Sequence, residues 1–350
     1  MSKQIEYTTP TPLLDKDGNL LAKGWARHNV FEYRRELCKP RWRLKEWDFH
    51  QFSDGRYKVL INFFNITVAT SAAASIRDVV TGELIAFNVV NIPFTRNRFL
   101  PPEVSDKSNK LTFEHGGIKM VFDTNMEKGV RHVTFQSTYK GNPISYDFYE
   151  YIPKNHENIT IVTPFKKKNQ FFLTTKQNCM KTEGKITIGT DVYTFDKENT
   201  FGVMDWGRGV WPHNCQWYWG NGATTITDEH GEKHTFGFEI TWLIGSDEYA
   251  TETCLFYDGV AHKIGRVDVK EFPGGKGWLK PWEFVSEDGR FNLTLTPFYD
   301  DCSGFIIKKF LGTKCHQAHG LFNGTVVLDD GKVLEIKDMY AFCEYVVNAW

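Results

Sequence analysis

The 350-residue sequence lacks most of the features that mark familiar classes of protein. No pair of its seven cysteines has the C-x-x-C spacing of a zinc or redox site, and their odd number and wide separation favour a reducing compartment. No window approaches the roughly 20 apolar residues of a membrane span, and the first residues include no apolar run typical of a signal peptide. We therefore expect a cytoplasmic protein with no membrane span.

Neither sign of charge is in excess. The chain has 42 basic and 43 acidic residues, so no global field favours nucleic acid as a partner. It also lacks a Gly-rich phosphate loop, a dinucleotide fingerprint, a nucleophile elbow and an H-E-x-x-H zinc motif. His316 and His319 are three apart in a strand-like segment and would face opposite sides. We expect no cofactor and no metal, and a small molecule as the partner.

Helical periodicity is scarce, whereas alternation of large apolar with polar or small residues recurs along the chain. The segments Tyr57–Ala69 and Thr235–Leu243 are examples, and Asp-Gly pairs such as Asp54-Gly55 and Asp258-Gly259 separate such runs. Aromatic residues make up 15% of the sequence, which also favours strands. This pattern predicts a mainly β protein, built as two packed antiparallel β-barrels with few short helices.

The chain is longer than a typical single domain of about 100–200 residues. Its composition changes near Thr190–Asn199, where a strand-like run gives way to charged residues and then to a Trp-rich segment. We predict two β-barrel domains, residues 1–195 and residues 196–350, with the Trp-rich segment in the second.

The Trp-rich segment, Gly202–Gly222, includes four of the eleven tryptophans. Its five glycines and one proline predict tight turns rather than one regular element. The aromatic side chains would form the walls of a cavity, and within it lies Asp205. In apolar surroundings desolvation would raise the pKa of this carboxyl and make it a general acid; alternatively, it caps a turn.

Several blocks together resemble domain of unknown function family 2804: Gly24–Arg27, Lys39–Trp47, the Trp-rich segment and the ending Ala341–Trp350. That family looks remotely similar to the carotenoid 1,2-hydratase and hydroxyneurosporene synthase group. The resemblance implies two lipocalin-like β-barrels and an aspartate, here Asp205, that protonates a carbon–carbon double bond in an aromatic pocket. His213 departs from the pattern, since a tyrosine is expected there.

Other polar residues are further candidates. Glu252 is expected on a strand within Tyr249–Phe256, pointing either into a barrel lumen or into water. Glu239 alternates with apolar neighbours and has the same two alternatives. His213 could shuttle protons near neutral pH. Arg208 stacks on a tryptophan or binds a substrate oxygen, or else it pairs with Asp205, in which case Asp205 would be an ionised base or a brace.

These residues favour a cofactor-free hydratase, isomerase or cyclase that transfers protons to and from an apolar unsaturated or ring-bearing molecule. Asp205 would be the acid, and Glu252 or His213 would orient water or take a proton. The substrate-binding residues would be Trp206, Arg208, Trp211, Trp217, Tyr218, Trp219 and Glu239. Two alternatives stay open: a non-catalytic carrier of a lipid-like ligand, and a carbohydrate-active enzyme with paired carboxylates.

Overall fold

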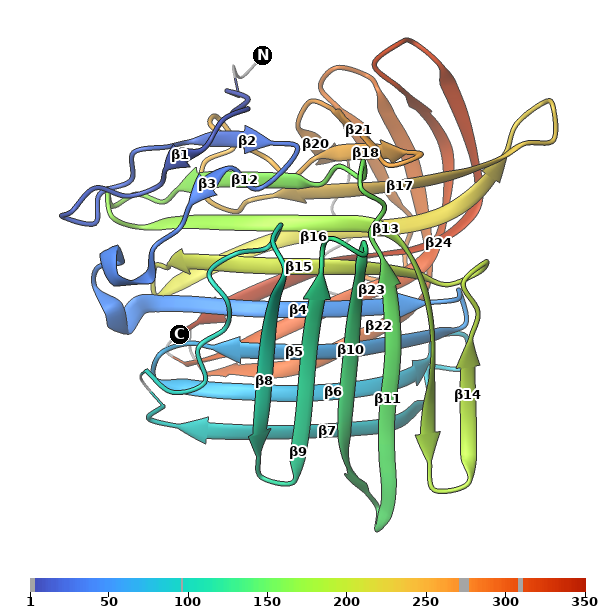
Figure 1. Ribbon diagram of the computed structural model, residues 1–350. Coiled ribbons are helices and arrows are strands. Elements are labelled where there is room, and N and C mark those ends of the chain that lie inside the picture. Colours follow the sequence, from blue (N-terminus) through green and yellow to red (C-terminus); the bar gives the residue numbers. More distant parts are fainter. Residues whose placement is uncertain (1–3, 96, 271–276, 308–310) are drawn as a thin grey trace.

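The computed structural model describes residues 4–95, 97–270, 277–307 and 311–350, and nearly all of its regular structure is β-sheet (Figure 1). In these ranges the helices are two 3₁₀ turns of three residues, η1 (Arg35–Leu37) and η2 (Arg41–Arg43). Neither is long enough to cross a membrane. The prediction of a mainly β fold with few short helices is confirmed.

Thirteen strands form the first sheet, and all the pairings between them are antiparallel. They are β2 (Gly24–Ala26), β4 (Leu44–Ser53), β5 (Tyr57–Asn65), β6 (Ala69–Asp78), β7 (Leu84–Pro93), β8 (Asn109–His115), β9 (Ile118–Asn125), β10 (Val130–Tyr139), β11 (Asn142–Tyr151), β12 (Ile159–Pro164), β13 (Phe171–Ile188), β14 (Asp191–Phe195) and β15 (Phe201–Val210). Two short strands, β1 (Thr11–Pro12) and β3 (Phe31–Glu32), pair separately.

Nine strands form the second sheet, which is also antiparallel. They are β16 (Asn214–Thr227), β17 (Lys233–Trp242), β18 (Cys254–Tyr257), β19 (Val260–Lys263), β20 (Val267–Val269), β21 (Trp282–Ser286), β22 (Phe291–Ile307), β23 (Leu311–Val327) and β24 (Val333–Ala349). The change of sheet therefore falls at residues 211–213, within the Trp-rich segment. The domain division at 195/196 stays a prediction.

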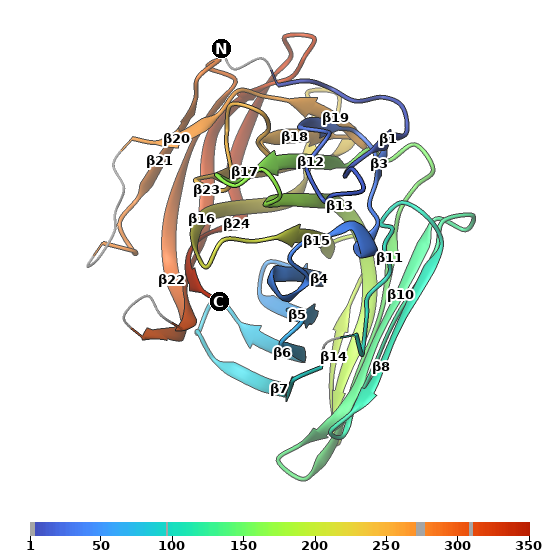
Figure 2. The ribbon, with the colours of Figure 1, turned by 90° about the vertical axis from the view of Figure 1, so that its left-hand side faces the viewer.

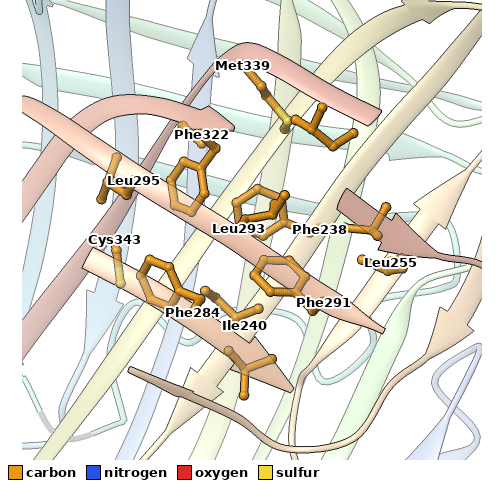
Figure 3. Packing of buried hydrophobic residues seen from close by; sticks show 14 of the residues in the cluster. Phe238, Ile240, Leu255, Phe284, Phe291, Leu293, Leu295, Phe322, Met339 and Cys343 are labelled. Carbon is orange, nitrogen blue, oxygen red and sulfur yellow. The ribbon is translucent and has the colours of Figure 1, made fainter. Parts of the chain in front are cut away.

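Each sheet curls around an apolar core. In the first sheet, strands β4–β7 run across β8–β11, and the two groups face each other as separate layers (Figures 1 and 2). Residues such as Phe52, Ile61, Phe113 and Phe148 fill the space between these layers. The core of the second sheet is shown in Figure 3, where Phe238, Phe284, Phe291 and Phe322 pack with leucines and Met339. The expected pair of barrel-like sheets is confirmed.

Strand β13 is the element that bends the first sheet. Its first half pairs with β12 and β15, and its second half pairs with β11 and β14. The register shifts between Gln177 and Met180, and Cys179 has a left-handed φ of 58°, as expected of a β-bulge. This bulge lies against the second sheet, because the Asn178 amide donates to the Phe238 carbonyl oxygen (2.9 Å).

The Trp-rich segment does not form the tight turns that its glycines predicted. Residues 201–210 are continuous strand β15, and residues 214–227 are continuous strand β16. Gly207 instead leaves room for a ring: a Cβ atom there would lie 2.1 Å from Cε2 of Trp47, on the paired strand β4. The glycine thus provides clearance for aromatic packing.

Candidate functional site

A cavity of about 480 Å³ lies between the outer faces of the two sheets. Strands β4, β5, β13 and β15 of the first sheet and β16, β17, β23 and β24 of the second contribute to its lining. Figure 2 shows these two groups of strands as neighbouring layers. Its aromatic lining residues are Trp47, Phe49, Phe64, Phe172, Trp211, Trp217, Trp219 and Trp350. The space suits an apolar or ring-bearing molecule.

Strand alternation decides which residues of the Trp-rich segment reach this cavity. Asp205 on β15 and Trp211, just after the end of β15, face it from one side, and Trp217 and Trp219 on β16 face it from the other. Tyr218 points to the other side of β16, into the core of the second sheet, where its ring stacks on Trp242. These orientations follow from the period of two along a strand.

Trp206 and Arg208 lie on the face of β15 that points away from the cavity. Trp206 packs with the N-terminal segment, and its ring meets Tyr33 edge to face. The Arg208 guanidinium lies over Trp206 and forms an ion pair with Asp48 at 2.7 Å, while Glu46 is 3.7 Å away. The alternative that Arg208 pairs with Asp205 is therefore wrong. We assign neither Trp206 nor Arg208 to the site.

A buried lysine, Lys176 on β13, is at the centre of the charged groups in the cavity. Its Nζ lies 2.7 Å from Oδ2 of Asp205, 3.7 Å from Oε2 of Glu252 and 4.1 Å from the ring centre of Trp219. Burial lowers the pKa of Lys176, but the charges of Asp205, Glu252 and Glu239 outweigh it and leave the pKa raised. The side chain therefore stays an ammonium ion.

Asp205 is 8% exposed and has two partners. Lys176 binds one of its carboxyl oxygens, and the hydroxyl of Thr174 donates to the other at 3.0 Å. Both partners are on β13, the strand that pairs with β15 along this stretch. This arrangement favours Asp205 as a charged counter-ion over the unpaired acid that the sequence suggested.

Glu252 has the properties expected of the acid. It is 1% exposed, and within the described chain neither carboxyl oxygen has a hydrogen-bond partner within 3.5 Å, since its ion-pair partner Lys176 is 3.7 Å away and Thr241 and Lys176 act on it only weakly. Burial raises the pKa of Glu252 to about 7, although Lys176 acts in the opposite direction. The residue lies in an irregular segment, because strand β18 begins only at Cys254. The prediction of a strand at Glu252 is wrong, and the carboxyl points neither into a barrel lumen nor into water but into the cavity between the two sheets.

Two further glutamates bind the indole N–H groups of the cavity tryptophans. Trp219 Nε1 donates to Glu239 at 2.6 Å, and the Asn178 amide donates to the other oxygen of Glu239 at 2.7 Å. Trp217 Nε1 donates to Glu344 at 3.1 Å. Burial raises the pKa of both glutamates, that of Glu239 to well above its usual range. These bonds fix the two rings in the cavity wall.

His213 lies in the link between β15 and β16, and its Nδ1 is 3.1 Å from the carbonyl oxygen of Trp350. It is not among the cavity-lining residues of the described chain. The sequence reasoning missed Lys176 and Glu344. Lys176 had a recognisable signal, since it is a single charge inside the run Phe171–Met180.

The family of the chain follows from comparison with known proteins. A sequence model of the domain of unknown function DUF2804 matches residues 4–350. The chain belongs to this family. Membership confirms the resemblance drawn from the Trp-rich segment and the other sequence blocks. No curated protein matches the chain.

Two solved structures are similar to this member of the family. One is kievitone hydratase from Nectria haematococca, with 13% identity and a TM-score of 0.47 over 87% of this chain and 89% of the other. The second is a protein from Nitrosomonas europaea with the provisional name AttH. It has 10% identity and a TM-score of 0.46 over 91% of this chain and 97% of the other.

Proposed function

We propose that this DUF2804 protein is an enzyme that hydrates or isomerises an apolar, unsaturated or ring-bearing small molecule by proton transfer. The observation that carries the proposal is Glu252, a buried carboxyl on the wall of an aromatic cavity, with no hydrogen-bond partner within 3.5 Å in the described chain and with Lys176 at 3.7 Å. A buried carboxyl that is so weakly hydrogen-bonded is costly, and such groups concentrate at functional sites.

The pKa of Glu252 suits both halves of an acid–base cycle. A group that titrates near pH 7 is present in both protonation states at neutral pH. It can therefore deliver a proton in one step and recover it in the next. The carboxyl of Asp205, held by Lys176 and Thr174, instead balances the charge of the ammonium ion.

Lys176 narrows the choice of substrate. Its ammonium ion already covers the face of Trp219, so that face is not open to a substrate cation. A fixed positive charge stabilises negative charge that develops on oxygen. We therefore favour a double bond or ring conjugated to a carbonyl oxygen over an isolated polyene.

The proposed hydration proceeds in two proton transfers. With the carbonyl oxygen against Lys176, a water molecule adds to the β carbon, and the charge that moves to the oxygen is stabilised by the ammonium ion. Glu252 then gives its proton to the α carbon, and the proton lost by the added water restores the acid. The sum is one water added to one double bond. Isomerisation uses the same groups without the water.

Two observations favour this function over carbohydrate chemistry. The cavity wall is mainly aromatic, and one lysine lies between the two carboxyls, where a glycosidase places the sugar and a water or nucleophile. A carrier function has the same requirement for an apolar cavity, so the experiment must separate binding from turnover.

The test is incubation of the purified protein with a cell metabolite extract, followed by mass spectrometry of bound and free compounds. The variants are Glu252→Gln and, as a matched control, the exposed Glu114→Gln. We expect Glu252→Gln to retain a compound that the wild type and the control convert. The product should be heavier by one water, or an isomer of the same mass. Loss of a general acid should slow turnover about 10²- to 10⁴-fold.

Two results would contradict the proposal. Equal turnover by Glu252→Gln and wild type would remove Glu252 from the mechanism. Retention of a compound by every form, with conversion by none, would establish a carrier. Circular dichroism of each variant checks that a loss of turnover does not reflect unfolding.

A further inference from the structure

Three buried lysines lie in or beside the cavity, and one of them has no acidic partner among the described residues. Lys176 pairs with Asp205 at 2.7 Å, and Lys58 pairs with Asp301 at 2.8 Å. Lys45 on β4 is 2% exposed, and the described chain offers it no ion pair. The one hydrogen bond that Lys45 makes within the described ranges is a long contact of 3.4 Å to the carbonyl oxygen of Ile66. Burial of an unpaired ammonium ion is costly.

Lys45 lies against one end of the cavity. Its Nζ is 5.5 Å from the ring centre of Trp350, and both Trp350 and Ile66 line the cavity. Burial and the charge of Arg43 together lower the pKa of Lys45 to about 8. Both effects would be relieved by an anion bound beside the ammonium group.

Two more donors at the same end have no oxygen or nitrogen acceptor in the described chain. They are the buried indole N–H of Trp350 and the buried amide nitrogen of Asn348, and both reach only the thiol sulfur of Cys215. The oxygen of the same Asn348 amide accepts from the Thr313 hydroxyl, which fixes the orientation of the amide. Their neighbour is the thiol of Cys215, whose pKa burial raises to about 12, so it offers only a neutral, weak acceptor.

From these three donors we propose that Lys45, Asn348 and Trp350 form a subsite for the acidic group of the ligand, so that the ligand is an apolar carboxylic acid. This inference deepens the proposed function by naming its substrate class. The apolar body would lie among Trp47, Trp211 and Trp217, which line the cavity. Trp211 contacts both Trp350 and Trp217, with ring centres 5.7 Å and 5.9 Å apart.

The test compares sodium decanoate with decan-1-ol, which share an alkyl chain and differ in the charged group. Binding is measured by the change in tryptophan fluorescence, because Trp211, Trp217 and Trp350 line the cavity. The wild type should bind decanoate about tenfold or more tightly than decanol, as expected for a charge-assisted hydrogen bond. Lys45→Met should lose this preference and keep its affinity for decanol, whereas Lys45→Arg should keep the preference.

A control variant is Lys110→Met, which changes a surface lysine that is 57% exposed and should leave both affinities unchanged. Three results would overturn the inference: no binding of decanoate to the wild type, no preference for decanoate over decanol, or an unchanged preference in Lys45→Met. Glu252→Gln should bind decanoate like the wild type. Failure of the proposed chemistry and failure of this subsite would therefore appear in different variants and different assays.

Discussion

Glu252 should destabilise the folded protein at neutral and alkaline pH. Burial raises the pKa of Glu252 from 4.5 to about 7, so the folded state retains this proton to higher pH than the unfolded state. Since the folded state binds more protons in this range, stability falls as the pH rises from about 4.5 to about 7. At 1.36 kcal/mol per pKa unit, the loss above pH 7 is about 3 kcal/mol.

Replacement of Glu252 by glutamine removes the titratable carboxyl group and keeps the shape of the side chain. Glu252→Gln should therefore gain stability over the wild type as the pH rises, by up to about 3 kcal/mol between pH 4.5 and pH 8. Urea unfolding at several pH values measures this difference. The exposed Glu114→Gln should show no such trend. A stability difference between Glu252→Gln and wild type that does not change with pH would refute the reasoning.

Three further variants test the packing around the cavity. Lys176→Met should lower the free energy of unfolding by about 3–5 kcal/mol, because it leaves Asp205 buried without its cation; urea unfolding measures the loss. Gly207→Ala should cost about 1–3 kcal/mol and lower the melting temperature, since the added Cβ would overlap Trp47. Arg208→Met should also lower the free energy of unfolding, because it leaves Asp48 buried without its cation. The affinity for decanoate should stay unchanged, because Arg208 faces away from the cavity.

The sequence predicted the fold well because strand alternation and turn residues act locally. Gly55 and Gly259 adopt the positive φ values, 90° and 82°, that their Asp-Gly turns required. The predicted strand Tyr57–Ala69 was too long, because Thr67 also takes a positive φ of 66° and separates β5 from β6. A threonine is uncommon in that conformation, so the residue types in this segment did not predict the break between β5 and β6.

The site was predicted only in part because its members come from both sheets. Asp205, Trp217 and Trp219 were identified from their density in one segment. Reading that segment as turns hid its alternation, which would have placed Arg208 on the opposite face from Asp205. Lys176 could not be assigned as the partner of Asp205, since that pairing depends on the register between two strands.

The hydrogen bonds from the two cavity indoles to Glu239 and Glu344 restrict which substitutions can occur at this site during evolution. A change of Trp219 to phenylalanine would take a hydrogen-bond donor from a carboxyl that lies in the core, and a change of Glu239 to leucine would leave an indole N–H without an acceptor. Each single replacement therefore lowers the stability of the fold, whereas the double replacement changes it little. Members of the family that bind differently shaped molecules should therefore differ at both positions of a pair together, and the two pairs should vary independently of each other.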